Sequence, residues 1–147
     1  MNRPIFSLVI FILTCSWPLQ SSAEKTYAPA KVVYDITTSN ARELNLLLDR
    51  VSLLQKIYNN DTFDAEIILV IHEGAIPLLV KNNQQTITLQ QRANSLTLGE
   101  MIQFRVCHAS VKMQGYSAKD FHSFITLVPM ADAEIIQLQH QGYAYLH

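Results

Sequence analysis

The sequence predicts an α/β fold: a mostly parallel sheet of about five strands between layers of helices, a three-layer α/β/α sandwich. Short apolar, β-branched runs alternate along the chain with stretches in which apolar residues recur every three or four positions. Of the 147 residues, 49% are hydrophobic and 16% are charged, which is enough for one buried core. Helices that connect parallel strands bury both faces of such a sheet.

The first 23 residues are expected to lie outside this fold. Arg3 supplies a positive charge, residues 5–17 form an apolar run, and the small residues Ser21 and Ala23 end the segment. This pattern is typical of a secretory signal peptide cleaved before Glu24. We therefore expect export, which in a bacterium means the periplasm. The apolar run is shorter than the roughly 20 residues that span a bilayer, so no stable membrane insertion is expected after cleavage.

Two alternatives exist for this segment: an uncleaved anchor, or a lipoprotein attached through Cys15. Thr14 is bulkier than the residue that lipoprotein processing usually needs before the cysteine. Cleavage would remove Arg3 and Cys15, leaving ten basic and twelve acidic residues, a net charge of −2, and Cys107 as the single cysteine. An internal disulfide would then be impossible, and stability must come from core packing.

After a short leader, residues 24–30, the segment Lys31–Ile36 reads as a strand. A helix of about five turns is expected from Asn40. Asn40 and Glu43 can serve as a capping pair at its start. Six apolar residues form one stripe on this helix: Leu44, Leu47, Leu48, Val51, Leu54 and Ile57. The next strand, Ala65–Ile71, is almost wholly apolar, as expected for a strand covered on both faces.

The second half of the chain continues the alternation. A short helix is expected in "AIPLLV", whereas Lys81–Gly99 is ambiguous, because "TITLQ" alternates like a strand and "QRANSLTLGEM" suits a helix. Ile102–Val106 is the third strand, followed by a short helix that Gly115 ends. Phe124–Val128 is the fourth strand.

The chain closes with a helix over Ala131–Gln141, ended by Gly142, and with "YAYL" as a last short strand. Three residues of that helix are expected to point inward: Ile135, Ile136 and Leu138. In parallel sheets, ligands bind beyond the carboxyl ends of the strands. Four stretches are expected there: Asp35–Thr38, His72–Gly74, Cys107–Ser110 and Pro129–Asp132.

Cys107 is the leading candidate for chemistry. Between a strand and the first turn of a helix, its sulfur would face unpaired backbone N–H groups that favour the thiolate and lower the thiol pKa. His108 or His72 could add positive charge or accept a proton. The alternative is a buried, inert cysteine that acts as a small hydrophobe. The histidines have alternatives too: His72 could finish its strand by bonding nearby backbone, and His108 could be a solvated first-turn residue.

Several other functions are disfavoured. His122, beside Asp120, is expected to be a surface residue, and the sequence has no metal motif and no tight histidine cluster. With four glycines and no phosphate-binding turn, it offers little for a nucleotide. A net charge near zero without a basic stripe argues against nucleic acid. No metal and no organic cofactor are expected.

Three segments, "VIHEGAIPLL", "FRVCHASVKMQGY" and "VPMADAEIIQLQHQGYAYLH", resemble the DsrE/DsrF-like family of small sulfur-relay proteins, in particular its exported branch. The resemblance covers residues 31–147, which we take as one DsrE-like domain. It implies a three-layer α/β sandwich and a homo-oligomer, a trimer or hexamer. It also implies that Cys107 carries sulfur as a persulfide and that His72 lines the same site. Gly74 and His108 are further candidate substrate-binding residues, although His108 and Ala109 stand where the family commonly has polar residues. Here Glu73 separates His72 from Gly74, where the family often has His-Gly.

The leading hypothesis is therefore a periplasmic sulfur carrier, sulfurtransferase-like, with an exposed, low-pKa Cys107 thiol. Its partners would be sulfur donor and acceptor proteins or small sulfane-sulfur compounds. One rival is a non-catalytic oligomeric binding protein in which Cys107 is structural. Another is a redox-sensing thiol that forms a mixed disulfide with a partner.

Overall fold

The structure, a computed structural model that describes residues 27–147, is built on a parallel sheet with the strand order β4-β3-β2-β1-β5. The five strands are β1 (Ala30–Ile36), β2 (Ala65–Ile71), β3 (Ile102–Cys107), β4 (Ile125–Val128) and β5 (Ala144–Leu146). Every pair of neighbours is parallel, which confirms the predicted α/β fold. The predicted signal peptide, residues 1–23, lies outside the described residues.

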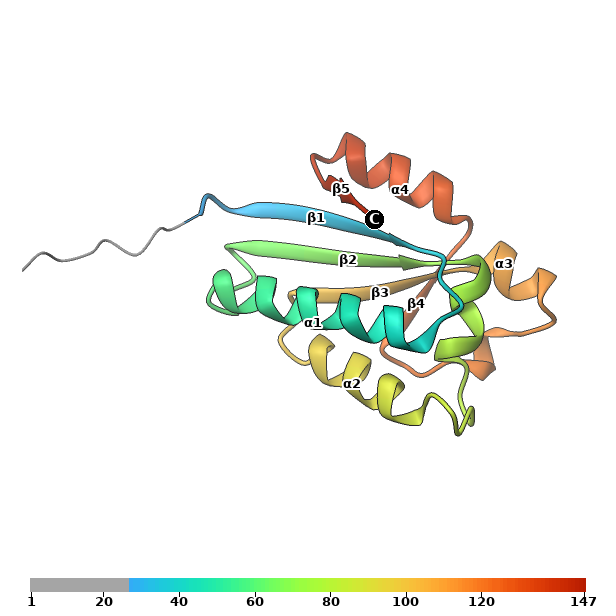
Figure 1. Cartoon of the computed structure of the whole chain (residues 1–147). Helices are drawn as coiled ribbons and strands as arrows, with labels where there is room; N and C mark the ends of the chain where they lie inside the picture. Colours follow the sequence, from blue (N-terminus) through green and yellow to red (C-terminus); the bar gives the residue numbers. More distant parts are fainter. Residues whose placement is uncertain (1–26) are drawn as a thin grey trace, which may run out of the picture.

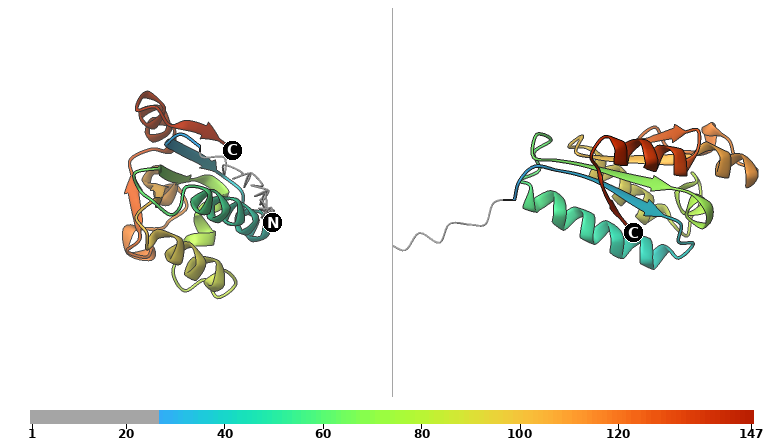
Figure 2. Two further views of the ribbon diagram at one scale, coloured as in Figure 1. Left: turned by 90° about the vertical axis from the view of Figure 1, so that its left-hand side faces the viewer. Right: turned by 90° about the horizontal axis from the view of Figure 1, so that it is seen from above.

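Helices cover the two faces of the sheet unequally (Figures 1 and 2). The helices α1 (Ala41–Ile57) and α2 (Ile87–Thr97) pack on one face, together with the 3₁₀ helix η1 (Glu73–Leu79). On the other face, α4 (Ala131–His140) carries the chain from β4, at one edge of the sheet, to β5 at the other. We call this second side the α4 face. No helix in residues 27–147 is long and apolar enough to cross a membrane.

The start of α1 differs in one detail from the expected capping box. The Asn40 side-chain oxygen accepts the N–H groups of Arg42 and Glu43, as an N-cap residue should. The Glu43 carboxylate, however, accepts the Thr38 hydroxyl at 2.5 Å instead of an N–H of Asn40. The Asn40 N–H donates to the same hydroxyl, so Thr38 stands between the two capping residues.

Other expectations about the helices are confirmed only in part. The ambiguous stretch 81–99 contains α2, so the helical reading is correct. Ile135 and Leu138 of α4 are buried, but Ile136 is 53% exposed, because the single apolar stripe of α4 does not reach it. On α1, the end of the predicted stripe is likewise open, with Ile57 54% exposed.

Alternation along the strands separates two clusters of buried side chains. The larger cluster lies under α1, α2 and η1 and includes Ile36, Ile71 and Val106. The smaller lies on the α4 face: Val33, Ile68, Val70, Cys107, Ala131, Ile135, Leu138 and Tyr143. Because successive residues of a strand point to opposite faces, the side chains of Asp35 and Cys107 belong to the α4 face.

Candidate functional site around Cys107

Cys107 ends β3 and is the N-cap residue of the short helix α3 (His108–Met113). Its Sγ accepts the backbone N–H of Ser110 at 3.4 Å. Ala131, the first residue of α4, is buried in the same small cluster as Cys107, and its N–H, the N–H of Ala109 and the Ser110 side chain also act to lower the pKa of the thiol. The starts of two helices therefore converge on one sulfur atom.

These donors change the acidity of the thiol. Burial acts to raise the pKa of Cys107, because it disfavours the charged form. The hydrogen bonds from Ser110, Ala131 and Ala109 act in the opposite direction and prevail, so the pKa lies below the ordinary value of a cysteine. The sequence position of Cys107 predicted this direction, but not the part that Ser110 and Ala131 play.

The thiol is not exposed, contrary to expectation. Cys107 is only 3% exposed, because its side chain lies within the small apolar cluster beneath the first turn of α4. The Ala109 N–H also donates to the Pro129 carbonyl at 3.2 Å, which ties the start of α3 to the loop that precedes α4. The groups that favour the thiolate are thus the same groups that cover it.

His72 directly follows β2, on the strand next to that of Cys107. The last registered pair between these strands is Ile71–Val106, so His72 and Cys107 are the next residue of each. Neighbouring strands lie about 4.8 Å apart. His72 continues the extended backbone of β2, and alternation places its side chain on the α4 face with Cys107.

A carboxylate that the sequence did not single out holds the His72 ring. Asp35, at the end of β1, lies 2.6 Å from His72 Nε2 through Oδ1. Its Oδ2 accepts the hydroxyl of Tyr145, on β5, at 2.7 Å. His72 is 9% exposed and therefore nearly buried. The predicted alternative for His72, a bond to backbone, is thus not the one its ring makes.

Tyr145, Asp35, His72 and Cys107 lie in that order at the carboxyl edge of the sheet, in or directly after the adjacent strands β5, β1, β2 and β3, and hydrogen bonds join the first three. The hydrogen bond to Asp35 is the main reason why the pKa of Tyr145 is raised. The sequence placed Asp35 at this edge, but the signal for its pairing with Tyr145 is absent, because the two residues lie 110 positions apart.

The other predicted binding residues have different surroundings. A Cβ on Gly74 would lie 2.8 Å from the Thr37 carbonyl oxygen, so Gly74 lets η1 approach the loop between β1 and α1. The preceding Glu73 has a φ of 49°, in the left-handed region. His108 is half-buried at the start of α3. His122, away from this edge, bonds the buried Gln90 through Nε2 at 2.9 Å and stacks on Phe124.

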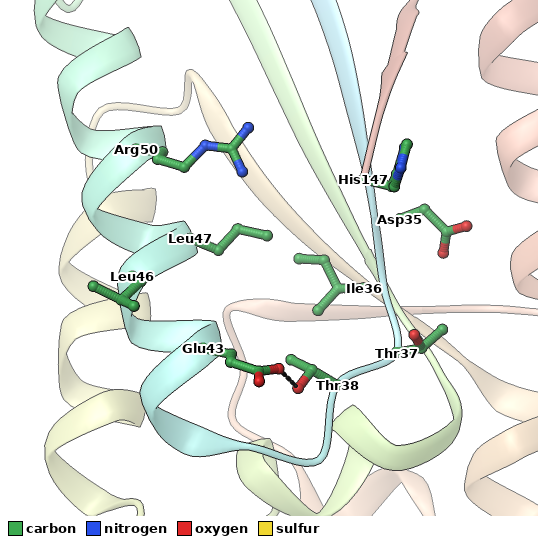
Figure 3. Close-up of a pocket in the computed structure, with 9 residues that line it drawn as sticks. All are labelled: Asp35, Ile36, Thr37, Thr38, Glu43, Leu46, Leu47, Arg50 and His147. Atoms are coloured by element: carbon green, nitrogen blue, oxygen red, sulfur yellow. Dashed lines mark hydrogen bonds between the residues drawn. The ribbon is translucent and has the colours of Figure 1, made fainter.

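A cavity of about 370 Å³ opens between the first half of α1 and the end of β1 (Figure 3). It is lined by Asp35, Ile36, Thr37, Thr38, Glu43, Leu46, Leu47, Arg50 and His147. Figure 3 shows the Asp35 carboxylate turned away from the α1 side chains. Asp35 thus borders the cavity and also bonds His72, but Cys107 does not line this cavity. Among residues 27–147, no three His, Cys, Asp or Glu side chains come together as metal ligands.

Comparison with known proteins decides the relationship of this chain. The family model of the DsrE/DsrF-like family matches residues 31–147. The chain belongs to the DsrE/DsrF-like family. Among solved structures, this DsrE/DsrF-like chain is similar to MTH1491, a protein of unknown function from Methanobacterium thermoautotrophicum, with a TM-score of 0.68 and 20% identity. The match covers 80% of this chain and 97% of the other, and it shows a shared fold. No curated protein matches the sequence.

Proposed function

We propose that Cys107 is a sulfur carrier, which accepts a sulfane sulfur from a donor, holds it as a persulfide and passes it to a partner thiol. Membership of the DsrE/DsrF-like family supports a role of this kind. The observation that carries the proposal is the position of Sγ at the starts of α3 and α4, where N–H groups from both helices favour an anionic sulfur.

The transfer is an exchange between sulfur atoms with no net oxidation. The Cys107 thiolate attacks the outer sulfur of a donor persulfide, R–S–SH. A bond forms between Sγ and that sulfur, the S–S bond of the donor breaks, and its electron pair leaves with R–S⁻, which takes up a proton from solvent. In the second half, an acceptor thiolate attacks the outer sulfur of the Cys107 persulfide, and the thiolate of Cys107 is released.

The hydrogen-bond donors around Sγ suit both halves. They stabilise the thiolate before it attacks and again when it becomes the leaving group, since a thiol of lower pKa leaves faster. The neighbouring His72 ring, held by Asp35, would line the space that the outer sulfur occupies. Gly74 and His108 remain further candidates for contact with the substrate.

The cellular setting belongs to the same proposal. The pattern of residues 1–23 supports export and cleavage after Ala23, and thus a periplasmic member of an exported branch of the family. Partners would be thiol proteins or small sulfane-sulfur compounds, and the protein would assemble as a trimer or hexamer. The reaction as written requires only the cysteine.

The burial of Cys107 favours a second candidate. At 3% exposure, the cysteine matches a small apolar filler in a non-catalytic oligomeric binding protein. The two candidates differ in what the sulfur can reach. A carrier must admit a donor when the first turn of α4 moves aside, whereas a filler remains closed.

The test is mass spectrometry of the Cys107 peptide after the folded protein has been incubated with polysulfide. A carrier gains the mass of one sulfur atom at Cys107, and a thiol acceptor added afterwards removes it. The Cys107→Ser variant is the control and gains nothing at this position. A wild-type protein that stays unmodified, with a Cys107 thiol that also resists alkylation, would establish the structural role instead.

A further inference from the structure

A second polar contact lies on the α4 face, at the residue of β3 that precedes Cys107 by two positions. Arg105 of β3 forms an ion pair through Nη1 with Oε1 of Glu134 on α4. Both side chains are mostly buried, at 20% and 18% exposure. The other guanidinium nitrogen, Nη2, donates to Oε1 of Gln103 at 2.9 Å, which fixes the plane of the Arg105 fork against β3.

The Arg105–Glu134 pair lies about as far along β3 and α4 as one would expect for a contact next to that between Cys107 and Ala131. Arg105 precedes Cys107 by two residues of a strand, about 6.6 Å. Glu134 follows Ala131 by three residues of a helix, about 4.5 Å. Ala131 shares a buried cluster with Cys107, and Glu134 pairs with Arg105, so the two contacts follow one another along β3 and α4. The first turn of α4 is therefore attached to β3 at two successive points.

We propose that Arg105 and Glu134 are positioning residues for Cys107: their ion pair holds the first turn of α4 so that Ala131 stays packed over the sulfur with its N–H nearby. α4 has no side-chain cap at Met130, so nothing in its own N-cap fixes this turn. The inference rests on the proposed function for what the thiolate does, but not for how the thiolate is held.

The charges around the thiol determine in which direction its pKa should shift when Glu134 is substituted. Titratable groups on the elements that pack around Cys107 are His108 and Lys112 on α3, Asp132, Glu134 and His140 on α4, Glu66 on β2, His72 after β2, Arg105 on β3, and Tyr143, which shares the cluster of Cys107. Removing the Glu134 carboxylate takes away negative charge and leaves the Arg105 charge without its ion-pair partner, and both effects lower the pKa of a nearby thiol. Losing the Ala131 N–H raises it. A positioning role and a purely electrostatic one therefore predict opposite shifts.

The experiment measures the pH dependence of iodoacetamide alkylation at the Cys107 peptide in the full-length protein. For Glu134→Ala, we expect the apparent thiol pKa to rise, because the Ala131 N–H leaves the sulfur. We expect the limiting rate at high pH to rise severalfold as well, because the cover is loosened. The charge-swapped variant Arg105→Glu/Glu134→Arg should restore both values towards wild type.

Asp132→Ala is the matched control, because it removes a carboxylate from the same turn of α4 without touching Arg105. It should lower the apparent pKa and leave the limiting rate unchanged. If Glu134→Ala does not fold, Glu134→Gln keeps the shape and a neutral hydrogen bond, and should show the same rises in smaller measure. A fall or no change in the pKa for the folded Glu134 variant would overturn the proposal. A wild-type protein that accepts no sulfur would overturn the sulfur-carrier function alone, since alkylation needs no sulfur donor.

Discussion

The Asp35–His72 contact is predicted to be one of the stronger single interactions in the fold, and the structure permits its size to be worked out. His72 Nε2 and Asp35 Oδ1 are 2.6 Å apart, and the His72 side chain is 11% exposed. Hydrogen bonds to charged groups contribute about 1.5–3 kcal/mol, and a buried donor left without a partner costs about 1–3 kcal/mol. Asp35→Ala should therefore lower the free energy of unfolding by about 2–3 kcal/mol.

The second partner of Asp35 should contribute much less. Tyr145 is 41% exposed, so water can replace its bond to the carboxylate when the hydroxyl is removed. Tyr145→Phe should cost about 0.5 kcal/mol, the low end for an intramolecular hydrogen bond. This contrast between two bonds to one carboxylate follows from burial alone.

A double-mutant cycle with Asp35→Ala and His72→Ala, read by urea unfolding at neutral pH, isolates the pairwise term. We expect the double variant to be less destabilised than the sum of the single variants by about 1.5–3 kcal/mol. Tyr145→Phe is measured beside it as the exposed reference. Additivity of the two alanine variants to within about 0.5 kcal/mol would refute the reasoning, because residues that share a strong bond cannot be independent.

Three further outcomes follow from the same structure. The bond to Asp35 raises the pKa of Tyr145, so its stabilising effect is complete below the usual tyrosine pKa of 10.0 and is lost as the pH rises through the folded value; an ultraviolet titration of the tyrosines should show Asp35→Ala moving one of them to lower pH. Gly74→Ala places a Cβ 2.8 Å from the Thr37 carbonyl oxygen and should lower the unfolding free energy by about 1–3 kcal/mol in urea, whereas an unchanged midpoint would mean that the loop yields freely. The lowered pKa of Cys107 favours the thiolate in the folded state, so its contribution is complete above the ordinary thiol pKa of 9.0 and is lost as the pH falls through the folded value; the stability difference between wild type and Cys107→Ala should grow from pH 6 to pH 9.

The order of the elements was predictable because all of them except α2 carry a clear local signal. The strand Ala65–Ile71 is apolar apart from Glu66, and its predicted bounds agree with the structure to the residue. Asn40 marks the start of α1 through its side-chain oxygen, and Gly115 and Gly142 end helices with φ values of 79° and 89°. Such signals depend on neighbours within a few positions, which is why they survive without any knowledge of the tertiary structure.

The candidate site was predictable only in part, because its pairing depends on the order of the strands. Topology placed Cys107 and His72 at one edge, but it could not show that β5 lies next to β1 and brings Tyr145 to Asp35. The prediction that Cys107 is exposed was wrong for a related reason. Its cover comes from α4, a helix that begins 24 residues later, and no local pattern indicates where that helix crosses the sheet.

The bond between Asp35 and Tyr145 joins the first strand to the last, and this affects how the protein is made and handled. A nascent chain that has emerged only as far as α4 already contains Cys107, His72 and Asp35, yet it lacks the Tyr145 hydroxyl that bonds Asp35. This edge of the sheet is therefore completed only when β5 has been synthesised. An affinity tag fused after His147 would begin beside the cavity that Asp35 borders, whereas a tag placed before β1 would leave that edge untouched.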